Sequence, residues 1–132
     1  MLPRILRLSA VLVVGVAVAQ AVPVESRFDS EGEGWTVIGD VHGATWLATE
    51  GLPPGCFKAI DDTTGLTWYF VAPAKFLGDQ SAAYGDTLSY DLWISARDAT
   101  PWASPWISIS GGGLRLDWSG AFPPLQQWTH YE

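Results

Sequence analysis

The chain has 132 residues, which is enough for one domain and too few for two. It carries 14 Asp and Glu against 7 Lys and Arg, so its net charge is -7 at neutral pH. An acidic surface repels phosphate backbones and anionic lipid headgroups, so the charge argues against nucleic acid and membrane surfaces as partners.

The first 21 residues have the organisation of a secretory signal peptide. Arg4 and Arg7 precede an apolar stretch from Leu8 to Val18, and Ala19-Gln20-Ala21 supplies the small residues of a cleavage site. The apolar stretch is shorter than the ~20 residues that span a bilayer, so we expect cleavage and no membrane insertion afterwards, with an uncleaved anchor as the alternative. A secreted domain over residues 22–132 would hold five cations against fourteen acids, a net charge of -9.

Short apolar runs separated by Gly, Pro, Asp and Ser clusters fill the rest of the chain, and no window shows a clean helical period. We predict strands near residues 34–38, 44–48, 57–60, 66–72, 87–95, 106–110, 114–118 and 128–131. This pattern indicates an all-β fold, a jelly-roll-like antiparallel β-sandwich. The only cysteine, Cys56, cannot form a disulfide within the chain, and a buried thiol is expected, with an intermolecular disulfide as the alternative.

The middle of the chain resembles a known family. Residues 68–80 read Trp-Tyr-Phe-Val-Ala-Pro-Ala-Lys-Phe-Leu-Gly-Asp-Gln, and residues 84–92 read Tyr-Gly-Asp-Thr-Leu-Ser-Tyr-Asp-Leu. Together they resemble the central signature of the laminin IV type A (laminin B) domain. Residues 28–35, 112–116 and 128–129 are similar to its flanking strands more loosely. The resemblance implies a jelly-roll β-sandwich, an extracellular location and a structural or binding role.

The setting of this domain differs from that in laminins, where cysteine-rich EGF-like repeats surround it. Here the predicted signal peptide leads straight into the domain, so the chain resembles a stand-alone bacterial-type member. The family pattern normally continues for several strands past Trp128, so we expect the domain to be incomplete at its C-terminal end.

The conserved-looking block has a physical interpretation of its own, as a corner that sets the fold. Pro73 lacks a backbone donor and ends the strand before it, and one helical turn is expected at 74–77. Phe76 and Leu77 would close the end of the sandwich. Asp79 and Gln80 would tie the turn to backbone amides. A ligand site at this block is the alternative.

The sequence gives no sign of an enzyme. It has no G-x-S-x-G elbow, no HExxH and no phosphate-binding loop, and its only histidines are His42 and His130. Paired carboxylates of the kind that cleave glycosides stay open, because fourteen acids offer many pairs. We therefore expect a non-catalytic protein.

Calcium is the one cofactor that the sequence raises. Asp29, Glu31 and Glu33 alternate before Gly34, and Asp40 stands at the twelfth position of the same stretch. This spacing resembles a D-x-D-x-D-G loop, although Glu replaces Asp at two positions and the flanks look like strands. The metal hypothesis is a structural Ca²⁺ held by these four carboxylates, and the alternative is a plain acidic turn.

Tryptophan is unusually frequent, with eight residues, all after the predicted signal peptide. Trp93, Trp102 and Trp106 are the candidates for a ligand-binding face, because exposed indoles stack on sugar rings. The alternative is packing inside the sandwich. Two functions follow: a structural or adhesion module that contacts extracellular proteins, or a carbohydrate-binding module that contacts a polysaccharide.

Overall fold

A computed structural model describes residues 23–62, 65–96 and 105–132. Within these ranges the elements, in chain order, are β1 (Thr36–Gly39), β2 (Val41–Leu47), β3 (Cys56–Asp61), β4 (Trp68–Val71), the 3-10 turns η1 (Ala74–Phe76) and η2 (Ser81–Ala83), β5 (Tyr90–Leu92), β6 (Ile107–Gly111), β7 (Leu114–Trp118) and β8 (Thr129–Tyr131). All strand pairs are antiparallel. The predicted all-β antiparallel fold class is confirmed.

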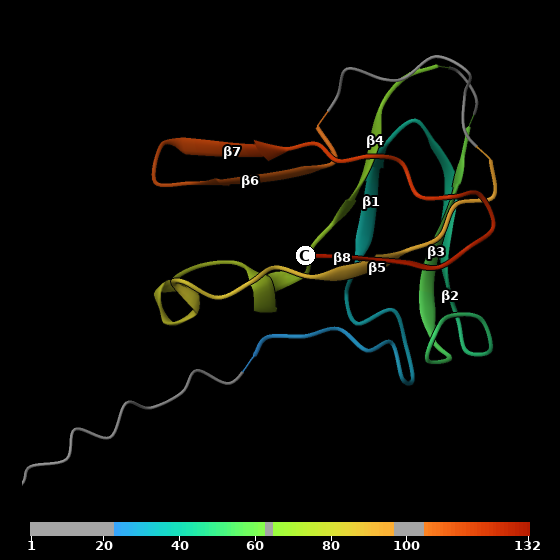
Figure 1. Ribbon diagram of the computed structural model, residues 1–132, viewed down its shortest axis with the longest axis horizontal. Coiled ribbons are helices and arrows are strands. Elements are labelled where there is room, and N and C mark those ends of the chain that lie inside the picture. The colour runs from blue at the N-terminus through green and yellow to red at the C-terminus, as the bar shows by residue number, and fades with distance from the viewer. Residues whose placement is uncertain (1–22, 63–64, 97–104) are drawn as a thin grey trace, which may run out of the picture.

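The strands form four two-stranded ladders of two kinds. The pairs β2–β3 and β6–β7 join neighbours in sequence, whereas β1–β4 and β5–β8 join strands that are distant in sequence. In Figure 1, β1 to β4 stand upright side by side, β5 and β8 run across them, and the β6–β7 hairpin projects to one side. No helix within the described ranges is long and apolar enough to cross a membrane.

The bounds of several strands depart from the sequence prediction, as two of them illustrate. The stretch predicted as a strand at 87–95 is a strand only over Tyr90–Leu92, because its partner β8 offers three residues to pair with. Conversely, β2 begins at Val41, before the predicted 44, since its partner β3 extends to Asp61. A strand is defined by its hydrogen bonds to a partner strand. The apolar pattern of one segment therefore does not show how many residues of its partner are available to pair with it.

Half-buried aromatic rings do most of the packing. Of the described residues, Cys56 and Pro123 alone are buried. The upright strands surround a first aromatic cluster made of Phe28, Trp35, Phe57, Trp68, Phe70 and Phe76. A second aromatic cluster, on β5, β7 and β8 and the segments beside them, is made of Tyr90, Trp106, Trp118, Phe122 and Tyr131. The prediction of a buried Cys56 thiol is confirmed.

The end of β1 tolerates only glycine. Gly39 has φ +96°, and a Cβ built there would lie 2.4 Å from the Thr67 carbonyl oxygen and 2.9 Å from the Trp68 Cα. We expect Gly39→Ala to lower the free energy of unfolding by about 3 kcal/mol, because both the backbone angle and the β1–β4 pairing must shift. Gly43→Ala is the matched control, since a Cβ at Gly43 meets nothing within 4 Å. Equal losses in urea unfolding of the two variants would contradict this account.

Candidate functional site

The block that carries the family resemblance forms a corner between β4 and η2. Pro73 ends β4 and precedes η1, as predicted. The Asp79 Oδ1 accepts a hydrogen bond from the Ser81 amide at 2.9 Å, which lowers the pKa of Asp79. Gln80 instead donates from its side chain to the Leu77 carbonyl at 3.0 Å. Asp79 therefore ties the turn to an amide as expected, whereas Gln80 binds a carbonyl.

Lys75 of η1 joins this corner to the segment before β1. Its Nζ donates to the Glu25 carbonyl at 2.7 Å and to the Glu33 Oε2. The other oxygen of Glu33, Oε1, accepts the Arg27 amide at 3.0 Å and the Phe28 amide at 2.5 Å. Both oxygens of one carboxylate are therefore used to fasten residues 25–28 against η1.

The environment of Glu33 favours its charged form. Burial alone would raise the pKa of this carboxyl, but hydrogen bonds from Lys75, the Phe28 amide and Ser26, with the positive charge of Lys75, lower it to about 2. The indole of Trp35 donates to the Ser26 Oγ at 2.7 Å, and that of Trp46 to the Phe28 carbonyl at 2.7 Å. Polar contacts thus fix the Trp35 ring and the Phe28 backbone of the first aromatic cluster.

The four predicted calcium ligands have separate surroundings. Glu33 is engaged by Lys75 and two amides, and the Asp40 Oδ2 accepts the Leu66 amide at 3.1 Å. Asp29 and Glu31 are exposed. Across residues 23–62, 65–96 and 105–132, no three His, Cys, Asp or Glu side chains form a group that could hold a metal ion. Calcium binding stays a prediction that this geometry does not favour.

The three tryptophans proposed as a ligand face have different settings. Trp106 is half-buried, and its ring lies 4.6 Å from Phe122 and 5.9 Å from Tyr131, so it packs within the second aromatic cluster. Trp93 is 37% exposed. Trp102 lies outside the described residues. For Trp106, the packing alternative fits the structure better than the sugar-stacking one.

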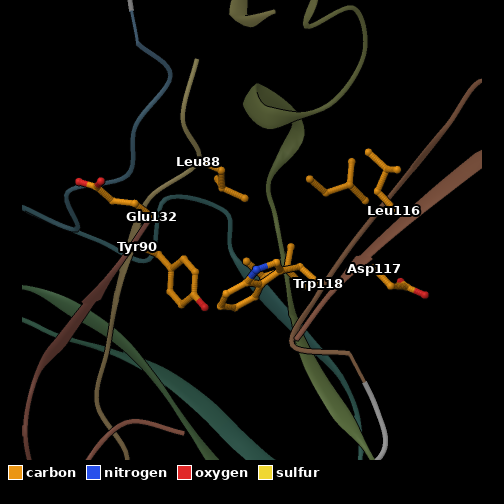
Figure 2. A pocket seen from close by; sticks show the side chains of 8 residues that line it. Leu88, Tyr90, Leu116, Asp117, Trp118 and Glu132 are labelled. Atoms are coloured by element: carbon orange, nitrogen blue, oxygen red, sulfur yellow. The ribbon is translucent and has the colours of Figure 1, made fainter. Parts of the chain in front are cut away.

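A hollow of about 300 Å³ adjoins the second aromatic cluster, and sequence reasoning did not predict it. Its lining is Leu88, Tyr90, Ile107, Ile109, Leu116, Asp117, Trp118 and Glu132. Figure 2 shows Tyr90 and Trp118 facing each other, whereas the carboxylates of Asp117 and Glu132 point away from the centre. The hollow is therefore apolar inside, with charge at its rim.

The β5–β8 ladder carries a charged pair at its centre. Asp91 faces His130 across the ladder, with Oδ1 2.9 Å from Nδ1, and the Glu132 Oε1 lies 3.5 Å from Nε2. The hydrogen bond to Asp91 raises the pKa of His130, Glu132 adds to this effect, and partial desolvation opposes it. When it is protonated, His130 forms an ion pair with Asp91 that links β8 to β5.

This pair predicts a pH dependence for the final strand. A pKa raised by folding gives stability that is fully present below the unfolded value of about 6.5 and is lost as the pH rises through the folded value. We expect amide exchange in β8, corrected for its intrinsic rate, to become faster as the pH rises through that range. His130→Gln should remove this trend and His42→Gln should keep it; a trend that survives in His130→Gln would contradict the assignment.

The second half of the chain is similar to a known protein family. Residues 69–132, which run from β4 through the corner to β8, match the family Laminin B (Domain IV). The second half of this chain belongs to the laminin B family. The corner, both 3-10 turns and all residues of the second aromatic cluster lie within the matched range.

Individual laminin subunits are similar over stretches of different length. Laminin subunit gamma-1 of Xenopus tropicalis is 31% identical over 96 residues, which is 70% of this chain and 6% of that protein. Gamma-1 of Danio rerio is 30% identical over 108 residues, 82% of this chain and 6% of that protein. Human gamma-2 is 48% identical over 48 residues, 36% of this chain and 4% of that protein. This chain thus spans a small part of each laminin subunit.

These alignments confirm the resemblance stated from sequence. Those of 96 and 108 residues are longer than the matched range 69–132, so they include part of the chain before β4. No solved structure matches the chain. Sequence reasoning found the laminin B corner but missed the contact between Glu33 and Lys75, because no local signal pairs residues that far apart.

Proposed function

We propose that this chain is a secreted, non-catalytic laminin IV module that makes structural contacts with other extracellular proteins. The observation that carries the proposal is the match of residues 69–132 to the laminin B family. The motif residues of the corner support it, because Lys75, Asp79 and Gln80 bind the chain's own backbone. Side chains that hold a fold together in this way are expected in a structural module.

Secretion is the first part to test. The positively charged start, the apolar stretch and Ala19-Gln20-Ala21 support export and cleavage before Val22. When the full chain is expressed in a host with a general secretory pathway, the protein in the medium should begin at Val22 by mass spectrometry. Ala21→Trp should block cleavage, because the cleavage site requires a small residue. Intact protein that stays inside the cells would contradict this part of the proposal.

Protein contact is the second part. Beads coated with the secreted protein should attach to decellularised extracellular matrix. Attachment should be lost after protease treatment of the matrix and kept after glycosidase treatment. The reverse pattern would contradict protein contact and favour a polysaccharide partner.

Thermal unfolding separates this function from the carbohydrate-binding and calcium hypotheses. A ligand that binds only the folded state must raise the melting temperature. We expect no rise with soluble polysaccharides, because Trp106, one of the three indoles of that hypothesis, packs against Phe122 and Tyr131. We also expect none with calcium, since Lys75 and two amides already use both oxygens of Glu33.

A further inference from the structure

The hairpin of β6 and β7 has one apolar and one polar face. Its register places Ile107 opposite Trp118 and Ile109 opposite Leu116, with Leu114 next along the same face. On this face Ile109 is 53% exposed, Leu114 74% and Leu116 68%. Large exposed apolar surfaces of this kind mark sites of contact with another molecule.

The polar face of the same hairpin carries a charged pair on β7. The Arg115 Nε donates to the Asp117 Oδ1 at 2.8 Å, and the Ser108 hydroxyl donates to the same oxygen at 2.7 Å. Arg115 and Asp117 are both exposed. One strand therefore presents a positive and a negative side chain two residues apart, with Leu116 between them.

The outer edge of β7 is available for pairing. Within the described ranges β7 pairs only with β6, and Figure 1 shows this hairpin projecting from the rest of the fold. A two-residue turn at Gly112 and Gly113, with φ +57° and +79°, closes the hairpin. Counting outward from this turn, alternate residues aim their backbone groups at β6, so Arg115 and Asp117 aim theirs at the outer edge. An edge of this kind is a template for another strand.

The sequence Leu114-Arg115-Leu116-Asp117-Trp118 is complementary to itself when it is turned around. In an antiparallel pair centred on Leu116, Arg115 of each copy lies opposite Asp117 of the other. Arg115 and Asp117, whose backbone groups point to the outer edge, are then also the residues that lie opposite each other in this pair. Leu114 of each copy meets Trp118 of the other on the apolar face.

We propose that β7 pairs with β7 of a second copy of this chain, antiparallel and centred on Leu116. The two hairpins then form a four-stranded sheet with one apolar face, and the four charged side chains alternate in sign across the two-fold axis. Opposite charges directly across a sheet stabilise the pair, and like charges destabilise it. An isologous contact of this kind closes on itself, so the product is a dimer.

Charge exchange at the two positions tests this register. Sedimentation equilibrium of the purified protein should show a dimer whose population grows from micromolar to millimolar concentration. Arg115→Asp and Asp117→Arg each place like charges opposite one another, so each variant alone should dimerise about tenfold more weakly. Mixing the two variants should restore the dimer, because each then supplies the charge that the other lacks. The double exchange in one chain should also restore it.

Controls separate this pairing from other effects. Lys58→Asp on β3 changes the net charge by the same amount as Arg115→Asp and should leave the dimer intact. Circular dichroism checks that each variant is folded, and the mixture remains informative even where a variant is less stable. The proposal is overturned by a protein that stays monomeric, by single variants that dimerise normally, or by a mixture that dimerises no better than its components.

Discussion

Glu33→Gln is expected to lower the free energy of unfolding by about 2 kcal/mol in urea denaturation, because hydrogen bonds to a charged group are stronger than those to a neutral one. The variant keeps the shape of the side chain but loses the charge that Lys75 and the Arg27 and Phe28 amides stabilise. Glu31→Gln is the matched control, since Glu31 is exposed two residues away; we expect a change within about 0.5 kcal/mol.

The same carboxylate predicts acid sensitivity. The pKa of Glu33 falls from 4.5 when unfolded to about 2 when folded, so its contribution is fully present above pH 4.5 and is lost as the pH falls toward 2. Stability should therefore decline over this window, and Glu33→Gln should decline less steeply because it has no proton to take up there. Parallel pH profiles of the two proteins would show that Glu33 is not the group responsible.

Tyr131→Ala is expected to release the final strand and to lower the free energy of unfolding by about 3 kcal/mol. The Tyr131 ring stacks on Tyr90 with centroids 5.1 Å apart and meets the edges of Trp106 and Trp118. Its loss would open the second aromatic cluster along one side. Urea unfolding followed by tryptophan fluorescence measures the effect, since Trp106 and Trp118 would both enter water.

Tyr131→Phe separates the ring from its hydroxyl. The hydroxyl donates to the Ala121 carbonyl at 3.0 Å, and removing one exposed hydrogen bond costs about 1 kcal/mol. The phenylalanine variant should therefore keep most of the stability. A loss as large as that of Tyr131→Ala would mean that the Ala121 contact, and not ring packing, holds β8.

Features that depend on residues close together in the sequence were easier to predict than features that depend on distant ones. The Pro73 boundary, the turn at η1 and the Asp79 contact with the Ser81 amide were predictable, because each depends on residues within a few positions of one another. The family resemblance came from the same stretch, and the comparisons bear it out. Strand ends were less predictable, since Tyr90–Leu92 is a strand only where β8 meets it.

By itself the sequence determined the all-β class, the corner and the family, because periodicity, turn residues and a contiguous motif are all written locally along the chain. Only the tertiary structure decided that Glu33 fastens Lys75 and two amides, that Trp106 packs against Phe122, and that a hollow opens beside Trp118. These depend on which faces of distant strands meet. The free energy of such contacts belongs to pairs of segments, so one segment read alone does not contain it.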